Sequence, residues 1–166
     1  MAIKKNNFNK VKEKFSTSAK YKPQRFLDLG GDFLDAVGLP GPAIGHLNMF
    51  LGHSDTGKTT ALLEAAVSAQ KMGILPVFII TEMKWDWSHA KEMGFQFEEV
   101  ADPATGEVID YKGFFLYIDR ERLECVEDVG AFIADILDEQ KRGTLPHDVC
   151  FFWDSVGSIP CRMSIE

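Results

Sequence analysis

The residues best suited to chemistry lie in one short segment, Gly52-His53-Ser54-Asp55-Thr56-Gly57-Lys58-Thr59-Thr60. The segment matches G-x-x-x-x-G-K-[ST], the pattern of a phosphate-binding loop, or P-loop. Its two glycines allow the backbone to curl so that successive N–H groups point at phosphate oxygens. In such a loop, Lys58 binds the β- and γ-phosphates of a nucleotide, and the Thr59 hydroxyl is placed to bind Mg²⁺. The segment therefore predicts a nucleotide site at the N-terminus of a helix.

Two carboxylates further along the chain are candidates for the rest of this site. Asp154 follows the apolar run Val149–Trp153, the arrangement of a Walker B aspartate that supports Mg²⁺. Without a P-loop, the same position would more often indicate an Asp that caps the next turn. Glu82 follows the apolar run Val77–Thr81, so it would emerge at the sheet edge where ligands bind. There a carboxylate orients and deprotonates the attacking water, whereas the alternative is a surface Glu at a strand end.

The elements that must position these side chains follow from the apolar pattern. The run His46–Leu51 predicts a buried strand before the loop, and Thr59–Met72 predicts a helix that ends at Gly73. The continuous apolar run Val77–Thr81 is typical of a parallel strand buried on both faces. Strand, loop, helix and strand form a βαβ unit, so we expect a right-handed crossover and a parallel sheet.

The pattern also predicts elements on either side of this unit. Upstream, glycines and prolines surround one short helix at residues 33–37. Downstream, we expect a helix at residues 84–93 and a β-hairpin between Phe95 and Ile118, with its turn at Asp102–Gly106. A core strand at 114–118, a helix from Val126 to Arg142 and a last strand at 149–153 complete the predicted order.

Composition places the chain among ordinary globular proteins. Its 166 residues suit one domain, with 45% hydrophobic and 26% charged residues. No apolar run approaches the roughly 20 residues that span a bilayer, and the N-terminus lacks the apolar region of a signal peptide. Cys125, Cys150 and Cys161 are odd in number and lack C-x-x-C spacing, which indicates reduced thiols in a cytoplasmic protein.

Charge divides the chain into a basic arm and an acidic body. The net charge is −7, but residues 1–25 carry eight basic side chains against Glu13 alone. The acidic body argues against a broad nucleic-acid surface on residues 26–166. The arm has an apolar face of Phe8, Val11 and Phe15 at helical spacing. Three readings stay open for it: contact with nucleic acid, docking on the acidic body of a neighbouring subunit, or a solvated tail.

Several separated blocks resemble the RecA recombinases, especially those that phages encode. They are the P-loop, the segment Glu82–Gly94 and the segment Phe151–Pro160, which occur in the family's order within residues 26–166. The stretch 33–40 is also similar to the family. The resemblance implies an α/β P-loop NTPase core of the RecA type, with a mostly parallel central sheet flanked by helices. It divides the chain into a basic arm at 1–25, suited to oligomerisation, and a partial RecA-like ATPase core at 26–166.

The resemblance also implies roles for individual residues. Lys58 and Thr59 would hold the phosphates of ATP and Mg²⁺, Glu82 would activate water, and Asp154 would support the metal. Lys58 and Glu82 lie 24 residues apart, which is also the family spacing. Two more residues of the same block match the family's base-binding positions: Asp86 falls where the family contacts adenine, and His89 where it usually has a tyrosine that stacks on the base.

Two departures from the family bear on function. The segment between Gly94 and Tyr117 is longer, so the predicted hairpin looks like an insertion. The family's two DNA-binding loops follow the segment that matches 159–166, so the resemblance implies an N-terminal portion, truncated after the Walker B strand. Single-stranded DNA would then bind through elements outside this sequence, and the full-length protein would form a filament of identical subunits, with no role for a membrane.

Three functions follow as alternatives. The first is a DNA-dependent ATPase of the RecA type that acts in homologous recombination and DNA repair. The second is a hexameric replicative helicase with the same core, which the Glu82–Gly94 segment disfavours. The third is a fragment that binds nucleotide without turnover and acts only with a complementing chain.

Overall fold

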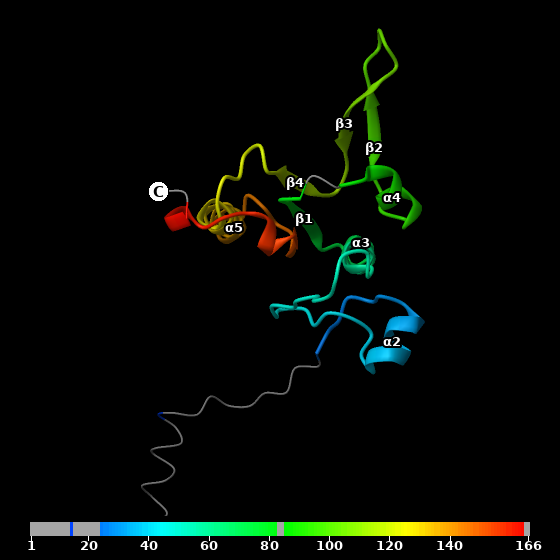
Figure 1. Cartoon of the computed structure of the whole chain (residues 1–166), viewed down its shortest axis with the longest axis vertical. Helices are drawn as coiled ribbons and strands as arrows, with labels where there is room; N and C mark the ends of the chain where they lie inside the picture. Colours follow the sequence, from blue (N-terminus) through cyan, green and yellow to red (C-terminus); the bar gives the residue numbers. More distant parts are fainter. Residues whose placement is uncertain (1–13, 15–23, 83–84, 165–166) are drawn as a thin grey trace, which may run out of the picture.

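The computed structural model describes residues 14, 24–82 and 85–164, so the prediction for the basic arm falls almost entirely outside the described residues. At its centre is a three-stranded sheet with the order β4-β1-β5. The strands are β1 (Leu75–Ile80), β4 (Leu116–Asp119) and β5 (Val149–Asp154). Both neighbours of β1 run parallel to it, as the sequence predicts. Figure 1 shows how the other elements surround this sheet.

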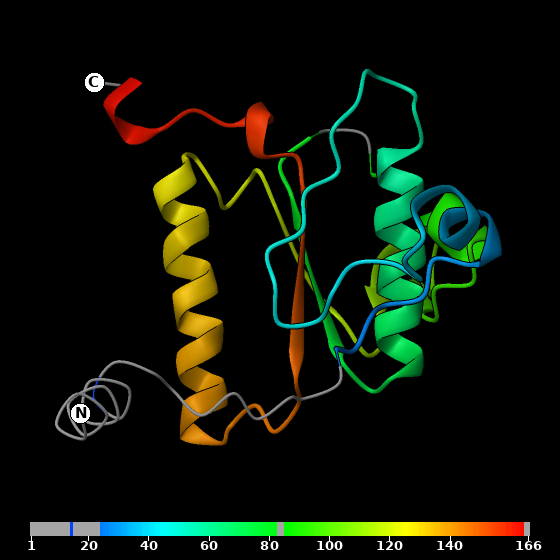
Figure 2. The same cartoon turned by 90° about the horizontal axis from the view of Figure 1, so that it is seen from below.

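Two long helices cover the sheet, α3 (Lys58–Lys71) on one face and α5 (Val126–Arg142) on the other (Figure 2). All six residues of β1 are buried, as expected for a strand between two helical layers. Phe78 and Ile80 belong to the core cluster of α3, whereas Ile79 belongs to the cluster of α5. The α/β fold with a parallel sheet flanked by helices is therefore confirmed. None of the helices in the described ranges has the length and apolar content needed to cross a bilayer.

A β-hairpin projects from the body where the sequence predicts an insertion (Figure 1). Its antiparallel strands are β2 (Glu98–Ala101) and β3 (Val108–Lys112). The preceding helix is α4 (Trp87–Glu92), which begins later than predicted because the Asp86 side chain caps it. The Trp87 ring stacks on Tyr111 with centroids 4.4 Å apart, so aromatic packing holds the hairpin against α4.

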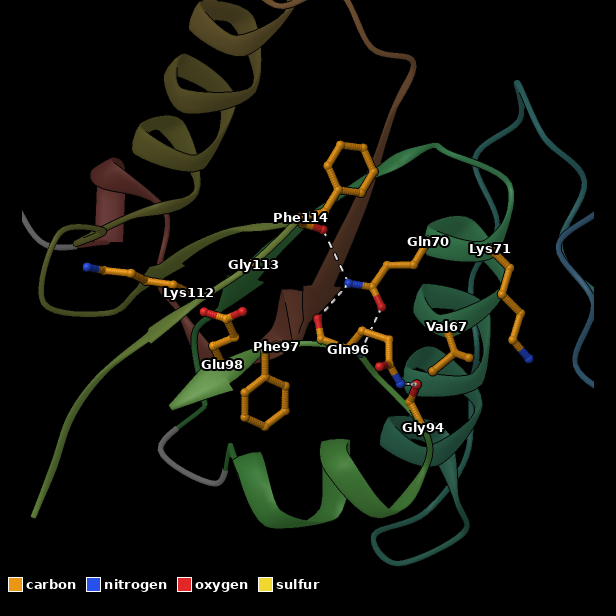
Figure 3. Close-up of a pocket in the computed structure, with 10 residues that line it drawn as sticks. All are labelled: Val67, Gln70, Lys71, Gly94, Gln96, Phe97, Glu98, Lys112, Gly113 and Phe114. Carbon is orange, nitrogen blue, oxygen red and sulfur yellow. Dashed lines mark hydrogen bonds between the residues drawn. The ribbon is translucent and has the colours of Figure 1, made fainter. Parts of the chain in front are cut away.

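The base of the hairpin is also fastened to α3, through the amide of Gln70 (Figure 3). The Gln70 Nε2 donates to the carbonyl oxygens of Gln96 at 3.0 Å and Phe114 at 3.3 Å. Its Oε1 accepts the Gln96 N–H at 2.9 Å. Beside these contacts lies a groove of about 730 Å³, whose walls include Val67 and Phe97.

The remaining described elements are short. The predicted helix at 33–37 is present as α2 (Gly31–Val37) and ends at Gly38, whose φ of 77° is the left-handed conformation that favours glycine. After β5, the chain forms two turns of 3₁₀ helix, η1 (Val156–Ser158) and η2 (Arg162–Ser164).

The predicted strand at His46–Leu51 is wrong. No strand is formed there, and Leu47 and Leu51 are 96% and 84% exposed. A strand exists only where a neighbour completes its ladder of hydrogen bonds. Within the described residues β5 pairs with β1 alone, and nothing pairs with residues 47–50. The parallel sheet therefore forms without the first strand of the expected βαβ unit.

The three free cysteines are expected to differ in reactivity. Burial raises the pKa of the Cys150 thiol from 9.0 to about 11, and Cys125 is buried, whereas Cys161 is exposed. Because the thiolate is the reactive form, we expect iodoacetamide at pH 8 to label Cys161 fast and Cys150 hardly at all. Mass spectrometry of timed samples checks this, with labelling in urea as the control for total thiol. Equal rates at Cys150 and Cys161 would contradict the packing of β5.

Candidate functional site

The P-loop forms a tight turn that leads directly into α3, which begins at Lys58. Gly57 precedes the helix with a φ of 82°, a conformation that side chains disfavour. At Gly52 a Cβ atom would lie 2.6 Å from the Thr56 hydroxyl, so a larger residue would displace the Thr56 side chain. The Thr56 hydroxyl donates to the His53 carbonyl oxygen at 2.8 Å and closes the loop. Gly57 is thus favoured by the backbone conformation, and Gly52 by its close contact with the Thr56 side chain.

Two side chains at the start of α3 face the loop and the sheet. Lys58 Nζ donates to the His53 carbonyl oxygen at 2.6 Å, so the ammonium group lies over the loop. The Thr59 hydroxyl donates to Asp154 Oδ2 at 2.7 Å, across 95 residues of sequence. A hydroxyl and a carboxylate oxygen at hydrogen-bond distance are the hard oxygen ligands that suit Mg²⁺. The donor set at this point therefore fits the metal that the sequence predicts.

Glu82 lies beside this pair because β1 and β5 end together. Ile80 is in register with Asp154, and the Glu82 N–H donates to the Asp154 carbonyl oxygen at 3.2 Å. The Ser155 hydroxyl donates to Glu82 Oε1 at 2.5 Å. The carboxyl ends of two neighbouring strands thus bring both predicted carboxylates to the same edge of the sheet as the loop.

These residues enclose one small cavity of about 130 Å³. It combines a lysine, three carboxylates and hydroxyl groups, a composition suited to phosphate and a cation rather than to an apolar ligand. Its walls are Ser54, Asp55, Lys58, Thr59, Ile80, Glu82, Trp85 and Asp154.

The other predicted site residues lie outside the walls of this cavity. Asp86 Oδ1 accepts the backbone N–H groups of Ser88 at 2.8 Å and His89 at 3.3 Å, so Asp86 acts as the N-cap of α4. Thr60 lies in the first turn of α3, partly buried. The roles of Asp86 and His89 toward adenine stay predictions.

Sequence reasoning missed two residues of the site. Trp85 lines the cavity and packs its ring on Phe78, with centroids 4.8 Å apart. Ser155 touches Glu82 through its hydroxyl. Their closeness in sequence to Glu82 and Asp154 was the available signal, but no local pattern distinguishes such neighbours from ordinary surface residues.

The comparisons with known proteins point to one family. No protein-family model matches the chain, and neither does any solved structure. Among curated proteins, the chain is similar to Protein RecA of Syntrophobacter fumaroxidans, with 36% identity over 74 residues, 43% of this chain and 22% of that protein. It is also similar to Protein RecA of Treponema denticola, with 37% identity over 75 residues, 44% of this chain and 18% of that protein. For Protein RecA of Mesoplasma florum the identity is 36% over 81 residues, 46% of this chain and 24% of that protein.

The aligned part spans between 18% and 24% of the length of these three relatives. The resemblance to the RecA family is thus confirmed as a partial match that covers less than half of the chain. The α/β core with its parallel sheet agrees with that family.

Proposed function

We propose that this chain is a nucleotide-binding and nucleotide-hydrolysing core of the RecA type, with ATP and Mg²⁺ as its ligands. One observation carries the proposal: Thr59 and Asp154 meet at 2.7 Å, and both line the cavity that Lys58 and Glu82 also line. The similarity of part of the chain to RecA proteins supports the same assignment.

The proposed chemistry is the attack of water on the γ-phosphate of ATP, which releases ADP and phosphate. The backbone N–H groups of the loop and the ammonium of Lys58 bind the β- and γ-phosphates and stabilise the charge of the transition state. Glu82 accepts a proton from the attacking water. Thr59 and Asp154 would hold Mg²⁺, which would neutralise charge on the phosphate oxygens.

The process that we propose for this chemistry is DNA recombination and repair in the cytoplasm. It rests on the family resemblance, in which ATP binding orders a filament on single-stranded DNA. The aligned part spans at most 24% of the length of these relatives, so DNA binding and filament assembly rest on the family resemblance alone. We prefer this function to a replicative helicase because the similar curated proteins are RecA proteins.

Lys58→Met is the direct test of the nucleotide site. The substitution keeps the length of the side chain but removes its charge, so we expect the affinity for Mg²⁺–ATP to fall about 10- to 100-fold, about 1.4–2.7 kcal/mol. Isothermal titration calorimetry with a non-hydrolysable ATP analogue measures the loss.

Lys71→Met is the matched control, since Lys71 is exposed in the last turn of the same helix and lines the groove rather than the cavity. Its affinity should equal that of the unsubstituted protein. Equal affinities for all three proteins would show that nucleotide binds elsewhere, and no measurable binding by the unsubstituted protein would refute the proposed function.

A further inference from the structure

We propose that Thr81 is a positioning residue for the nucleotide site. Its buried hydroxyl fixes the turn that follows β5; Asp154 is the last residue of β5, and the turn begins with the serine that contacts Glu82. The inference deepens the proposed function and rests on it, because it concerns the geometry of the same two carboxylates.

The hydroxyl of Thr81 is at the centre of a hydrogen-bond network. Thr81 follows β1 directly and is 0% exposed. Its Oγ1 donates to the Ser155 carbonyl oxygen at 2.8 Å. It also accepts the indole N–H of Trp153 at 3.0 Å and the hydroxyl of Ser158 at 2.7 Å. A hydroxyl has one proton and two lone pairs, so this set uses its full capacity.

The network ties the end of β1 to the chain that follows β5. The Thr81 N–H donates to the Asp154 carbonyl oxygen at 2.9 Å. The backbone and the side chain of Thr81 therefore bind the carbonyl groups of two consecutive residues, Asp154 and Ser155. On one side of that turn, the Asp154 carboxylate accepts the Thr59 hydroxyl. On the other side, the Ser155 hydroxyl donates to Glu82. The carboxylates of Asp154 and Glu82 therefore share one anchor, Thr81, which is not among the residues that line the cavity.

Removal of the hydroxyl would loosen the turn rather than unfold the protein. Thr81→Val keeps the shape of the side chain but leaves the Trp153 N–H without its partner and removes the donor that Thr81 supplies to the Ser155 carbonyl. The Ser158 hydroxyl has a single proton, which loses its acceptor at Thr81 and turns to the Ser155 carbonyl oxygen at 2.7 Å, so part of the turn remains closed. A partly buried donor without a partner is unfavourable, and the chain is expected to relieve this by moving the turn.

The first experiment uses the nucleotide-free protein. We expect hydrogen exchange at the amides of Thr81, Glu82 and Ser158 to become at least about tenfold faster in Thr81→Val. In Thr81→Ser, which keeps the hydroxyl, the rates should stay within about threefold of the original. Unchanged exchange in Thr81→Val would overturn the proposed anchor, whether or not the protein binds nucleotide.

The second experiment measures how much Mg²⁺ strengthens the binding of a non-hydrolysable ATP analogue. Groups that orient metal ligands typically change metal affinity by about 10- to 100-fold, and we expect Thr81→Val to lose the Mg²⁺ enhancement by a factor in this range. Thr81→Ser should retain it. If Thr81→Val keeps the full Mg²⁺ enhancement while its hydrogen exchange is faster, Thr81 has only a structural role, and the proposal is overturned.

The two failures remain distinguishable. If the unsubstituted protein binds no nucleotide, the proposed function and the positioning role fall together, while the exchange rates still decide whether Thr81 anchors the turn. If Thr81→Val does not fold, Ser158→Ala replaces it, since this change removes one hydroxyl partner from the same turn. A Mg²⁺ enhancement that is severalfold smaller in Ser158→Ala supports the proposal, and an unchanged one overturns it.

Discussion

Glu82→Gln is expected to reduce ATP hydrolysis by about 10²- to 10⁴-fold, with nucleotide affinity close to that of the unsubstituted protein. Glutamine keeps the size of the side chain and an oxygen that can accept the Ser155 hydroxyl, but it cannot take a proton from water. Glu82 touches neither Lys58 nor Thr59 through any described hydrogen bond, so phosphate binding should persist. Phosphate release under single-turnover conditions, with single-stranded DNA present, measures the rate.

The control for this change is Glu92→Gln, which removes a carboxylate from the exposed side of α4 outside the cavity. Its hydrolysis rate should not change. A Glu82→Gln protein that hydrolyses ATP at the original rate would exclude Glu82 as the base. A protein whose affinity falls in parallel with its rate would instead place Glu82 in nucleotide binding.

Phe78→Ala is expected to cost about 3–5 kcal/mol of the free energy of unfolding. Phe78 lies in the central strand, is 0% exposed and contacts the rings of Trp85, Phe95, Phe115 and Phe152. Removal of this ring leaves a cavity between the sheet and α3. The cavity cannot close, because β4 and β5 hold the central strand in place on both sides. Urea denaturation followed by circular dichroism measures the loss.

Phe114→Ala serves as the comparison, since the same atoms are removed from a side chain that is 36% exposed and contacts only the His147 ring among the described aromatic residues. We expect it to lower the free energy of unfolding by about 1 kcal/mol. Similar losses for the two variants would mean that the centre of the sheet is not the main core of the protein.

The strands could be predicted where helices of the same chain bury them. The apolar runs that became β1 and β5 have helices on both faces, so their composition alone identified them. The hairpin was predictable because its turn residues, Asp102 to Gly106, permit few other conformations. In both cases a local pattern carries the information that decides the structure.

The segment at residues 46–51 shows where such patterns fail. Its apolar run predicts a buried strand, but a strand also needs a partner, and no sequence pattern records which partners are present. The predicted start of α4 was wrong for a smaller reason. The Asp86 side chain accepts the first N–H groups of the helix, so the helix begins after Asp86.

The candidate site divides in the same way. The P-loop, Glu82 and Asp154 could be predicted because each has a fixed place relative to a strand or a helix, and the cavity brings them together. The contacts of Thr81 with Trp153, Ser155 and Ser158 join residues more than 70 positions apart. Such contacts depend on the register between β1 and β5, which only the folded sheet defines.

The pairing of β1 with β5 also limits when the sheet can form during synthesis. Leu75 pairs with Val149, and a ribosome that adds about 5–20 residues per second needs about 4–15 s to extend the chain by the 74 positions from one to the other. Throughout this interval the apolar central strand has emerged without its β5 neighbour and is exposed to self-association, against which chaperones protect nascent chains. The phosphate loop and Glu82 are made before Asp154, so the nucleotide site is completed only when β5 pairs with β1.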